Sequence, residues 1–277
     1  MKPFEHLLIL SDLDNTFLGK ASRIVPENIE AIERFKSLGG KFAFATGRDP
    51  FALLRVVPTA AEIANYPCIV TNGAYVYDFQ AKKPLDEHPL NREQIIPILS
   101  EMLERHPRVD LRFSTADRFL TPRLTSALAE DLKSFHDLIE EVALHNIPRD
   151  TVLYKAVFHG KNSDLLALRD DILKYDLSAY TCYFSCSVLF EVLDREGTKG
   201  RRVDMLRSYD PCLSYTYGVG DHENDLQLLE HANCACSPEN AIPLIHEASS
   251  VHLCHCDHGA IADLIDRISH SNGGIIQ

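Results

Sequence analysis

The sequence predicts an α/β protein in which a parallel sheet flanked by helices is interrupted by an α+β insertion. Short apolar runs alternate with helical stretches towards both ends of the chain, which is typical of strands joined by crossover helices. From about Asp86 the pattern changes to one helix followed by two strands, twice over. The 277 residues are enough to bury the cores of two modest domains. We therefore expect a discontinuous core of residues 1–85 and 189–277, with residues 86–188 forming a separate domain.

The first elements are marked by the residues at their ends. Leu7 to Ser11 is an apolar run that predicts a strand, and Pro26 opens a helix that ends at two glycines. Asp49 and Pro50 are suited to the cap and first turn of another helix, which should end near residue 57. Further strands are expected at 41–45 and 68–70, and a hairpin begins at 75.

The same kinds of sequence pattern predict the helices and strands of the insertion and of the C-terminal part. In the insertion we expect helices over 91–106 and 162–173, helical turns up to about 145, and strands at 111–113, 119–121, 152–158, 180–185 and 188–193. After it, Thr198 is suited to cap a helix that runs to Leu206. Apolar runs then predict strands at 215–219, 233–236 and 251–253, which return the chain to the first sheet.

The composition excludes some classes of partner. Lys and Arg number 28 against 40 Asp and Glu, which gives a net charge of −12. This charge argues against a nucleic-acid partner but allows a small anionic substrate held by local positive charge. We expect no signal peptide and no membrane span, because the apolar run at residues 7–10 is short and no window approaches about 18 apolar residues. Eight cysteines without an export signal predict reduced thiols and a cytoplasmic protein.

Polar residues follow four of the expected core strands. Ligands of open parallel sheets bind outside the carboxyl ends of the strands, so these segments predict one shared site. The four segments are Asp12 to Thr16, Thr46 to Arg48, Thr71 to Gly73, and Gly220 to Asp225.

Asp12 and Asp14 lie two residues apart, just past an apolar strand. Two such carboxylates repel unless a cation or a proton lies between them, and Mg²⁺ favours oxygen ligands. One carboxylate could attack a phosphorus centre and form an aspartyl phosphate, while the other protonates the leaving oxygen and later activates water. The alternative is a surface turn capped by Asp and Asn.

Asp221 and Asp225 would complete an oxygen site for Mg²⁺ if they meet Asp12 and Asp14 in space. Alone, they are acidic residues favoured at a helix N-terminus. Lys199 lies in the first turn of an expected helix, where it would help a phosphate to dock, or it is a solvated lysine.

The end of the second expected strand offers two further groups. The hydroxyl and backbone N–H groups at Thr46 are suited to phosphate oxygens, although the segment is equally read as a plain turn. Arg48 is either a guanidinium that faces the substrate or a surface charge.

In chain order, the segments Asp12-Leu13-Asp14-Asn15-Thr16, Thr46, Lys199 and Gly220 to Asp225 resemble the four motifs of the haloacid dehalogenase (HAD) superfamily. The insertion falls between the second and third motifs, as the C2 cap does. Thr71 to Ala74 and Leu189 to Leu193 resemble segments of the Cof-type, or subclass IIB, hydrolases. The resemblance implies a Rossmann-like core, a C2B-type cap that controls substrate specificity, and a Mg²⁺-dependent phosphoric monoester hydrolase.

The resemblance also implies a role for each matching residue. Asp12 would be the nucleophile and Asp14 the general acid/base, with Thr46 and Lys199 holding the transferring phosphoryl group. The groups that bind substrate would be Thr46, Gly47, Arg48, Asn72, Lys199 and Asn224, the last reaching the phosphate or Lys199. The groups at the metal would be Asp12, the backbone carbonyl of Asp14, Asp221, and Asp225 either as a ligand or through water.

Three functions are compared. The first is a phosphatase acting on a small phosphorylated metabolite, namely a sugar phosphate, a nucleotide or flavin phosphate, or pyridoxal phosphate. The second is a phosphomutase of the phosphomannomutase type, for which the sequence shows no second phosphate clamp. The third is a non-catalytic sensor of a phosphorylated ligand. The cap should supply contacts to the leaving group, with basic candidates at Arg112, Arg118, Arg123 and Lys155.

Four cysteines near the C-terminus admit two interpretations. Cys234 and Cys236 alternate along one expected strand, and Cys254 and Cys256 follow the next. Their thiols would converge on a structural zinc ion if they shared a face. We favour the alternative, in which reduced cysteines pack in the core as small apolar side chains.

Overall fold

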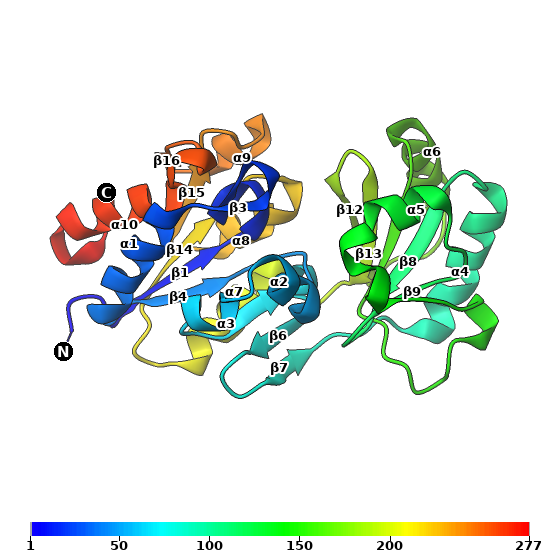
Figure 1. Cartoon of the computed structure of the whole chain (residues 1–277), viewed down its shortest axis with the longest axis horizontal. Coiled ribbons are helices and arrows are strands. Elements are labelled where there is room, and N and C mark those ends of the chain that lie inside the picture. The colour runs from blue at the N-terminus through cyan, green and yellow to red at the C-terminus, as the bar shows by residue number, and fades with distance from the viewer. Residues whose placement is uncertain (1, 277) are drawn as a thin grey trace.

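The computed structural model describes residues 2–276 and divides the chain into two lobes, each built around its own sheet (Figure 1). The larger lobe carries both ends of the chain and holds a five-stranded parallel sheet in the order β16-β15-β14-β1-β4. Its strands are β1 (Leu7–Ser11), β4 (Lys41–Phe44), β14 (Tyr215–Val219), β15 (Cys234–Pro238) and β16 (Val251–Leu253). Chain segments from both ends of the sequence therefore form one sheet, as the sequence predicts.

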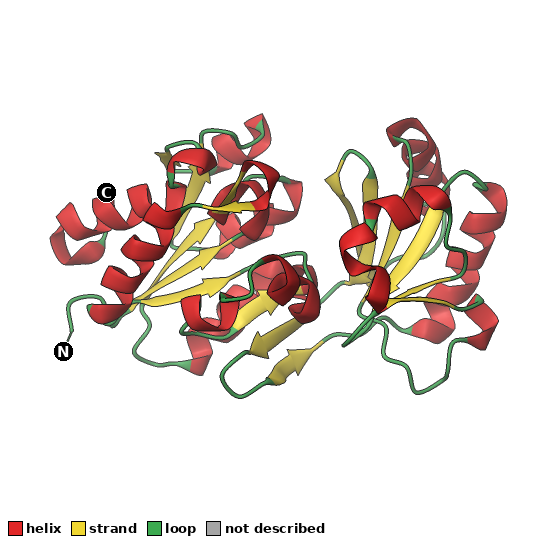
Figure 2. Ribbon diagram, viewed as in Figure 1, coloured by secondary structure: helices red, strands yellow, loops and turns green. Residues whose placement is uncertain are grey.

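The parallel sheet is buried between helices. Every residue of β1 is buried, as expected for a central strand covered on both faces. Helix α1 packs on α10, and α7 packs on α8 (Figure 2). The helices of this lobe are α1 (Pro26–Ser37), α2 (Pro50–Val56), α3 (Ala60–Ile63), α7 (Lys199–Tyr209), α8 (Leu226–His231), α9 (Pro243–Ala248) and α10 (Ala260–His270).

Two small antiparallel elements border the parallel sheet. A three-stranded ribbon, β5-β6-β7, is joined to it through a single parallel bridge between Ala45 and Ile69. A short hairpin, β2-β3, lies between β1 and α1 in the chain. Their strands are β2 (Leu18–Gly19), β3 (Arg23–Ile24), β5 (Cys68–Val70), β6 (Tyr75–Asp78) and β7 (Lys83–Glu87).

The second lobe, here called the cap, holds a six-stranded sheet in the order β10-β9-β8-β11-β13-β12. The strands are β8 (Asp110–Ser114), β9 (Phe119–Thr121), β10 (Ile139–Glu141), β11 (Lys155–His159), β12 (Tyr180–Cys186) and β13 (Leu189–Asp194). Its helices are α4 (Arg92–Arg105), α5 (Ser126–Asp131) and α6 (Asn162–Ile172). Apolar residues of α4 and α6 and of alternate strand positions form one buried cluster, which covers one face of the sheet.

The cap sheet differs from the sequence expectation in two places. We placed the end of the insertion at residue 188, but β13 pairs on one side with β11 and on the other with β12. The sheet therefore continues to Asp194, because a strand with two cap neighbours cannot be part of the parallel sheet. Between residue 121 and about residue 145 we expected only helical turns, whereas β10 forms a short edge strand parallel to β9.

Among the described residues, no helix has the length and apolar character needed to cross a bilayer.

Candidate active site

The polar ends of β1 and β14 meet because these two strands are parallel neighbours in the sheet. Ser11 pairs with Val219 in the register, and the N–H of Asp12 donates to the carbonyl of Val219 at 2.8 Å. The residues that follow, Asp12 on one strand and Asp221 on the other, therefore leave the sheet at the same edge. The ends of β1 and β14 therefore lie side by side, as a shared site would require.

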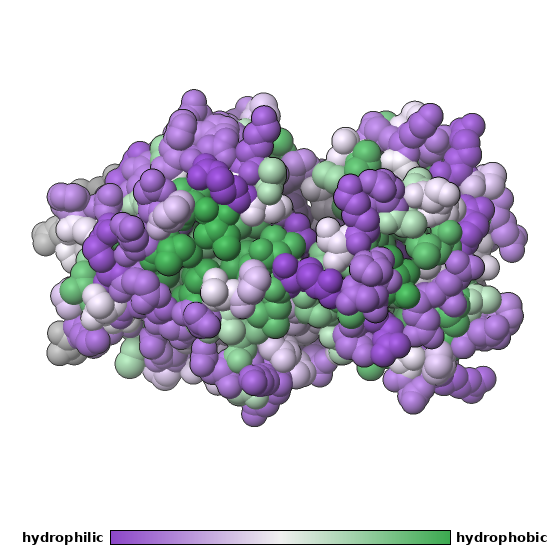
Figure 3. Space-filling view, viewed as in Figure 1, coloured by the Kyte–Doolittle hydropathy of each residue, from purple (hydrophilic) through white to green (hydrophobic). Residues whose placement is uncertain are grey.

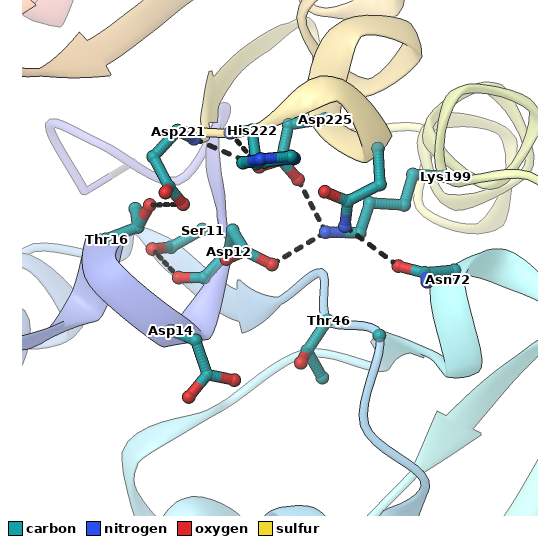
Figure 4. Close-up of polar contacts among 12 residues, drawn as sticks. Ser11, Asp12, Asp14, Thr16, Thr46, Asn72, Lys199, Asp221, His222 and Asp225 are labelled. Atoms are coloured by element: carbon teal, nitrogen blue, oxygen red, sulfur yellow. Dashed lines mark hydrogen bonds and ion pairs between the residues drawn. The ribbon is translucent and has the colours of Figure 1, made fainter. Parts of the chain in front are cut away.

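Three carboxylates and one ammonium group form a buried cluster at this edge (Figure 4). One oxygen from each of Asp12, Asp221 and Asp225 lies within 4.8 Å of the other two. Lys199, at the start of α7, donates through Nζ to Asp12 Oδ1 at 2.7 Å and to Asp225 Oδ1 at 2.5 Å. Lys199 is only 1% exposed, so it is not a solvated surface lysine.

The electrostatics of the cluster follow from its burial. Burial, followed by the charge of Asp225, raises the pKa of Asp12 well above its usual range and that of Asp221 to about 7. Burial opposes the charged form of Lys199, but the charges of Asp12 and Asp225 outweigh it and raise its pKa. The three carboxylates thus share a single cation, which favours binding of additional positive charge.

Local hydrogen bonds hold the carboxylates in place. Thr16 donates its hydroxyl to Asp221 Oδ1 at 3.0 Å. Asp225 Oδ2 accepts the N–H groups of Asp221 at 3.0 Å and of His222 at 3.2 Å. The Cβ of any residue other than glycine at Gly220 would overlap the side chain of Asp225, which explains the glycine before this turn.

Asp14 departs from the four-carboxylate site that we expected. Its side chain points away from Asp12 in Figure 4 and pairs with Arg48 instead. Arg48 Nε and Nη2 donate to the two oxygens of Asp14, each at 2.8 Å. This forked pair neutralises Asp14, so its carboxylate stays outside the buried cluster of Asp12, Asp221 and Asp225. Arg48 is therefore not a free surface charge.

The segments that follow β4 and β5 add Thr46 and Asn72 to the site, and these segments are here called its floor. Thr46 is buried, and its Oγ1 accepts the N–H of Arg48 at 3.1 Å. Asn72 Oδ1 accepts from Asn224 Nδ2 at 3.1 Å. The hydrogen bond that the structure gives Asn224 is thus to Asn72, and not to Lys199 as the sequence analysis allowed.

The cap reaches this floor through a buried ion pair. Glu191 on β13 accepts from Asn72 Nδ2 at 2.6 Å and from Ser185 at 2.7 Å. Lys155 on β11 lies 3.1 Å from Glu191 Oε2 and donates to the carbonyl of Gly47 at 2.8 Å. Burial opposes ionisation of Glu191, yet Lys155 brings its pKa below the usual value. Core and cap are therefore tied together beside the carboxylate cluster.

A cavity of about 540 Å³ lies between the two lobes, and part of the groove between them is visible at the top of Figure 3. Its lining includes Asp12, Asp14 and Asp221 from the core. Of the four basic candidates in the cap, Arg112 and Lys155 line this cavity. Arg118 pairs instead with Asp117 and Glu140, and Arg123 with Asp110, away from it.

Two buried acidic residues of the site were missed by the sequence analysis. Asp49 was expected to cap α2, but its side chain makes no capping bond and accepts the hydroxyls of Thr71 at 2.7 Å and Ser114 at 2.9 Å. Glu191 lies in a predicted strand and in a segment that resembles Cof-type hydrolases, but the sequence analysis gave it no role of its own. A charged residue inside a buried apolar run is a signal that could have drawn attention to Glu191, because such residues are rarely buried unless they are paired.

The cysteines do not gather at one point in the described part of the chain. Cys234 and Cys236 place their sulfurs 3.8 Å apart, and all eight cysteines are free thiols. Cys256 instead lies near His255 and Asp257. Among the described residues, the four thiols do not form the alternative zinc site, and Cys234 and Cys236 pack in the main core cluster, as the favoured interpretation predicts.

The donor set at the carboxylate cluster fits Mg²⁺. It offers carboxylate oxygens alone, which are the ligands that this ion prefers. The excess of negative charge over the single ammonium group of Lys199 supplies the attraction. Asp12, Asp221 and Asp225 are therefore the side chains suited to hold the ion.

The buried carboxylate cluster lies at the ends of parallel strands, beside the inserted domain, as the resemblance to the HAD superfamily implies. Residues 9–265 match the haloacid dehalogenase-like hydrolases, and the chain belongs to that family.

Phosphatases of two bacteria are similar to the chain along most of its length. A 5-amino-6-(5-phospho-D-ribitylamino)uracil phosphatase of Bacillus subtilis is 25% identical over 290 residues, which cover 94% of this chain and 97% of the relative. An HMP-PP phosphatase of Serratia proteamaculans is 26% identical over 263 residues, or 91% of each chain.

Solved structures share the fold. A haloacid dehalogenase-like hydrolase from Bacteroides thetaiotaomicron superposes with a TM-score of 0.81 at 19% identity, covering 95% of this chain and 99% of that one. The subclass IIB sugar phosphatase BT4131 superposes with a TM-score of 0.79 at 17% identity, covering 95% and 98%.

Proposed function

We propose that the protein is a phosphatase that hydrolyses small phosphomonoesters through a phosphorylated Asp12. The observation that carries this proposal is the buried cluster of Asp12, Asp221, Asp225 and Lys199 at the edge of the substrate-sized cavity. The relatives named as phosphatases support it, since each is similar to this chain over nine-tenths of its length.

The first step is attack by a carboxylate oxygen of Asp12 on phosphorus. A phosphorus–oxygen bond forms to Asp12 while the bond to the leaving oxygen breaks. Lys199 and Thr46, both buried beside Asp12, hold the transferring phosphoryl group. Asp12, Asp221, Asp225 and the backbone carbonyl of Asp14 would hold Mg²⁺, which would supply positive charge to neutralise the phosphoryl oxygens.

Asp14 supplies and removes protons. It gives a proton to the leaving oxygen in the first step, and in the second step it takes one from the water that attacks phosphorus and releases Asp12. Both of its oxygens are held by Arg48 in the structure, so this pair must open before Asp14 can act. A substrate whose phosphoryl oxygens bind Arg48 would open it, which assigns Arg48 a role in binding.

The cap restricts access to this chemistry. Lys155 and Glu191 hold the cap against Gly47 and Asn72, so leaving groups must fit the cavity between the lobes. We infer that Gly47, Asn72 and, through Asn72, Asn224 position the substrate rather than react with it.

The test is phosphate release from a panel of sugar, nucleotide, flavin and pyridoxal phosphates, in Mg²⁺ and in EDTA. The proposal predicts release by the wild type in Mg²⁺ and none in EDTA. Isomerised sugar phosphate without free phosphate would instead identify a phosphomutase. Binding of a phosphorylated ligand with no turnover by folded protein would favour the sensor.

A further inference from the structure

Arg112 is a partly buried cation in the lining of the cavity. It lies on β8 beside Val157 of β11, in the same row of the sheet as Glu191 of β13. Side chains alternate along a strand, and Leu111 and Phe113 enter the apolar cluster beneath the sheet. Arg112 therefore belongs to the opposite face, which looks onto the cavity.

The guanidinium group makes no hydrogen bond and no ion pair within the part of the chain that the structure describes. Its Nη1 atom is fully buried and has no partner. A buried donor without an acceptor is unfavourable, and more so when it is charged. The group is held by stacking, because its central carbon lies 4.4 Å from the centre of the Phe119 ring.

The nearby carboxylates balance the charge of Arg112 but do not bind it. Asp49 and Glu191 are the acidic groups whose charges act on it most strongly. The two oxygens of Asp49 already accept the hydroxyls of Thr71 and Ser114. The oxygens of Glu191 are likewise taken by other donors, namely Asn72, Lys155 and Ser185.

The other cations of the cavity lining are occupied. Arg48 is bound to both oxygens of Asp14, and Lys155 is bound to Glu191 and to the carbonyl of Gly47. Among the arginine and lysine side chains of this lining that the structure describes, Arg112 is therefore the one that is fixed in position without a bonded partner. Fixed donors in a site with little water are the arrangement that binds an anion without reorganisation.

We propose that Arg112 binds a second anionic group on the substrate, a carboxylate or a phosphate, so that the preferred substrates are phosphomonoesters whose leaving group is itself acidic. The inference rests on the proposed phosphatase function, and it adds the chemical class of the leaving group. The planar guanidinium fork matches two oxygens of either anion. Leu132, Phe135 and Phe119 line the cavity as well, so the body of the leaving group contacts an apolar wall.

The test compares pairs of substrates in which one member carries a second anion in addition to its phosphomonoester. Glucose 6-phosphate against 6-phosphogluconate tests a carboxylate, and fructose 6-phosphate against fructose 1,6-bisphosphate tests a phosphate. In the wild type, the acidic member of one pair should have the higher kcat/KM. Arg112→Met should lower kcat/KM for that member by about 100-fold, the effect of two charge-assisted hydrogen bonds, and by less than about threefold for its neutral partner.

Two further variants separate binding from folding. Arg112→Lys keeps the charge but loses the fork, so it should fold and fall between wild type and Arg112→Met for the acidic substrate. Arg118→Met removes an exposed cap arginine bound to Asp117 and Glu140. It should leave kcat/KM unchanged for both the acidic and the neutral substrate.

The outcomes distinguish the two proposals. Equal losses for acidic and neutral substrates in Arg112→Met, or a wild type that prefers the neutral members of both pairs, would overturn the role of Arg112 while leaving the phosphatase in place. No phosphate from any compound with folded wild type and Mg²⁺ would contradict the phosphatase itself, and the inference with it.

Discussion

The two walls of the cavity hold their positive charge in different ways. On the core wall, Lys199 lies between two carboxylates, at 2.7 Å from Asp12 and 2.5 Å from Asp225. On the cap wall, Arg112 is balanced by charges that do not touch it and has no bonding partner among the described residues. The difference teaches that the cation of the core is already bonded to carboxylates, whereas the cation of the cap wall leaves donors for a ligand. This contrast is the one expected if the core performs the reaction and the cap selects the leaving group.

The largest effect should come from the core wall. Asp12→Asn keeps the size of the side chain but removes the nucleophile, so phosphate release should fall by about 10⁴-fold or more. Activity is measured by phosphate release with every substrate that the wild type hydrolyses. A matched control is Asp170→Asn, which alters an exposed cap carboxylate paired with Arg169. Retention of more than about a tenth of the activity in Asp12→Asn would show that the core wall does not carry out the reaction.

A variant of Lys199 tests whether the stability of the buried carboxylate cluster depends on its ammonium group. Lys199→Ala leaves three buried carboxylates without their shared ammonium group, and breaking a buried ion pair in this way costs about 3–5 kcal/mol of unfolding free energy. Urea denaturation in EDTA measures the loss. Lys133→Ala, which alters an exposed lysine of the cap, serves as the control and should leave the urea midpoint unchanged. A Lys199→Ala protein as stable as the wild type would show that the cluster does not depend on this charge.

The core wall was predictable because its geometry follows from strand order alone. Asp12 and Asp221 come directly after neighbouring parallel strands, so their meeting needs no knowledge of side-chain packing. The position of Asp14 was not predictable in this way. Its partner Arg48 is 34 residues away, and the competition between Arg48 and a cation for Asp14 is decided by the loop conformation.

The cap wall could be predicted only in outline. Arg112 and Lys155 were two of four basic candidates, and the antiparallel register decides which of the four face the cavity. The hydrogen bond from Asn72 to Glu191 joins residues that are 119 positions apart in the chain, so no local sequence pattern predicts it. The last strand of the insertion was assigned to the core for the same reason, since only its pairing with β11 and β12 shows where it belongs.

A smaller effect is expected at the contact between the walls. Glu191→Gln keeps the shape of the side chain but leaves Lys155 buried without its carboxylate, at a cost of about 2 kcal/mol in unfolding free energy. Urea denaturation checks the value, with Glu140→Gln, an exposed cap glutamate bound to Arg118, as the control. Equal stability of the two variants would mean that the buried pair does not hold the cap to the core.

The smallest effect should come from the exposed bridge between the lobes. Arg55 on α2 reaches Asp137 in the cap at 2.8 Å, but both side chains are well exposed. Solvent screens such pairs, so Asp137→Asn should leave the urea midpoint and KM unchanged within error. A clear rise in KM from this change alone would show that cap position depends on surface contacts as much as on Glu191.

The most direct measurement is the detection of phosphate on Asp12. In Asp14→Asn the base that activates water is missing, so a substrate with a good leaving group, such as p-nitrophenyl phosphate, should phosphorylate the enzyme faster than water releases it. Acid quenching followed by mass spectrometry should then find one phosphoryl group per chain, on the peptide that contains Asp12. The double variant with Asp12→Asn should carry none. A burst of p-nitrophenol without phosphorylated protein, or a phosphoryl group on another residue, would contradict the account of the core wall.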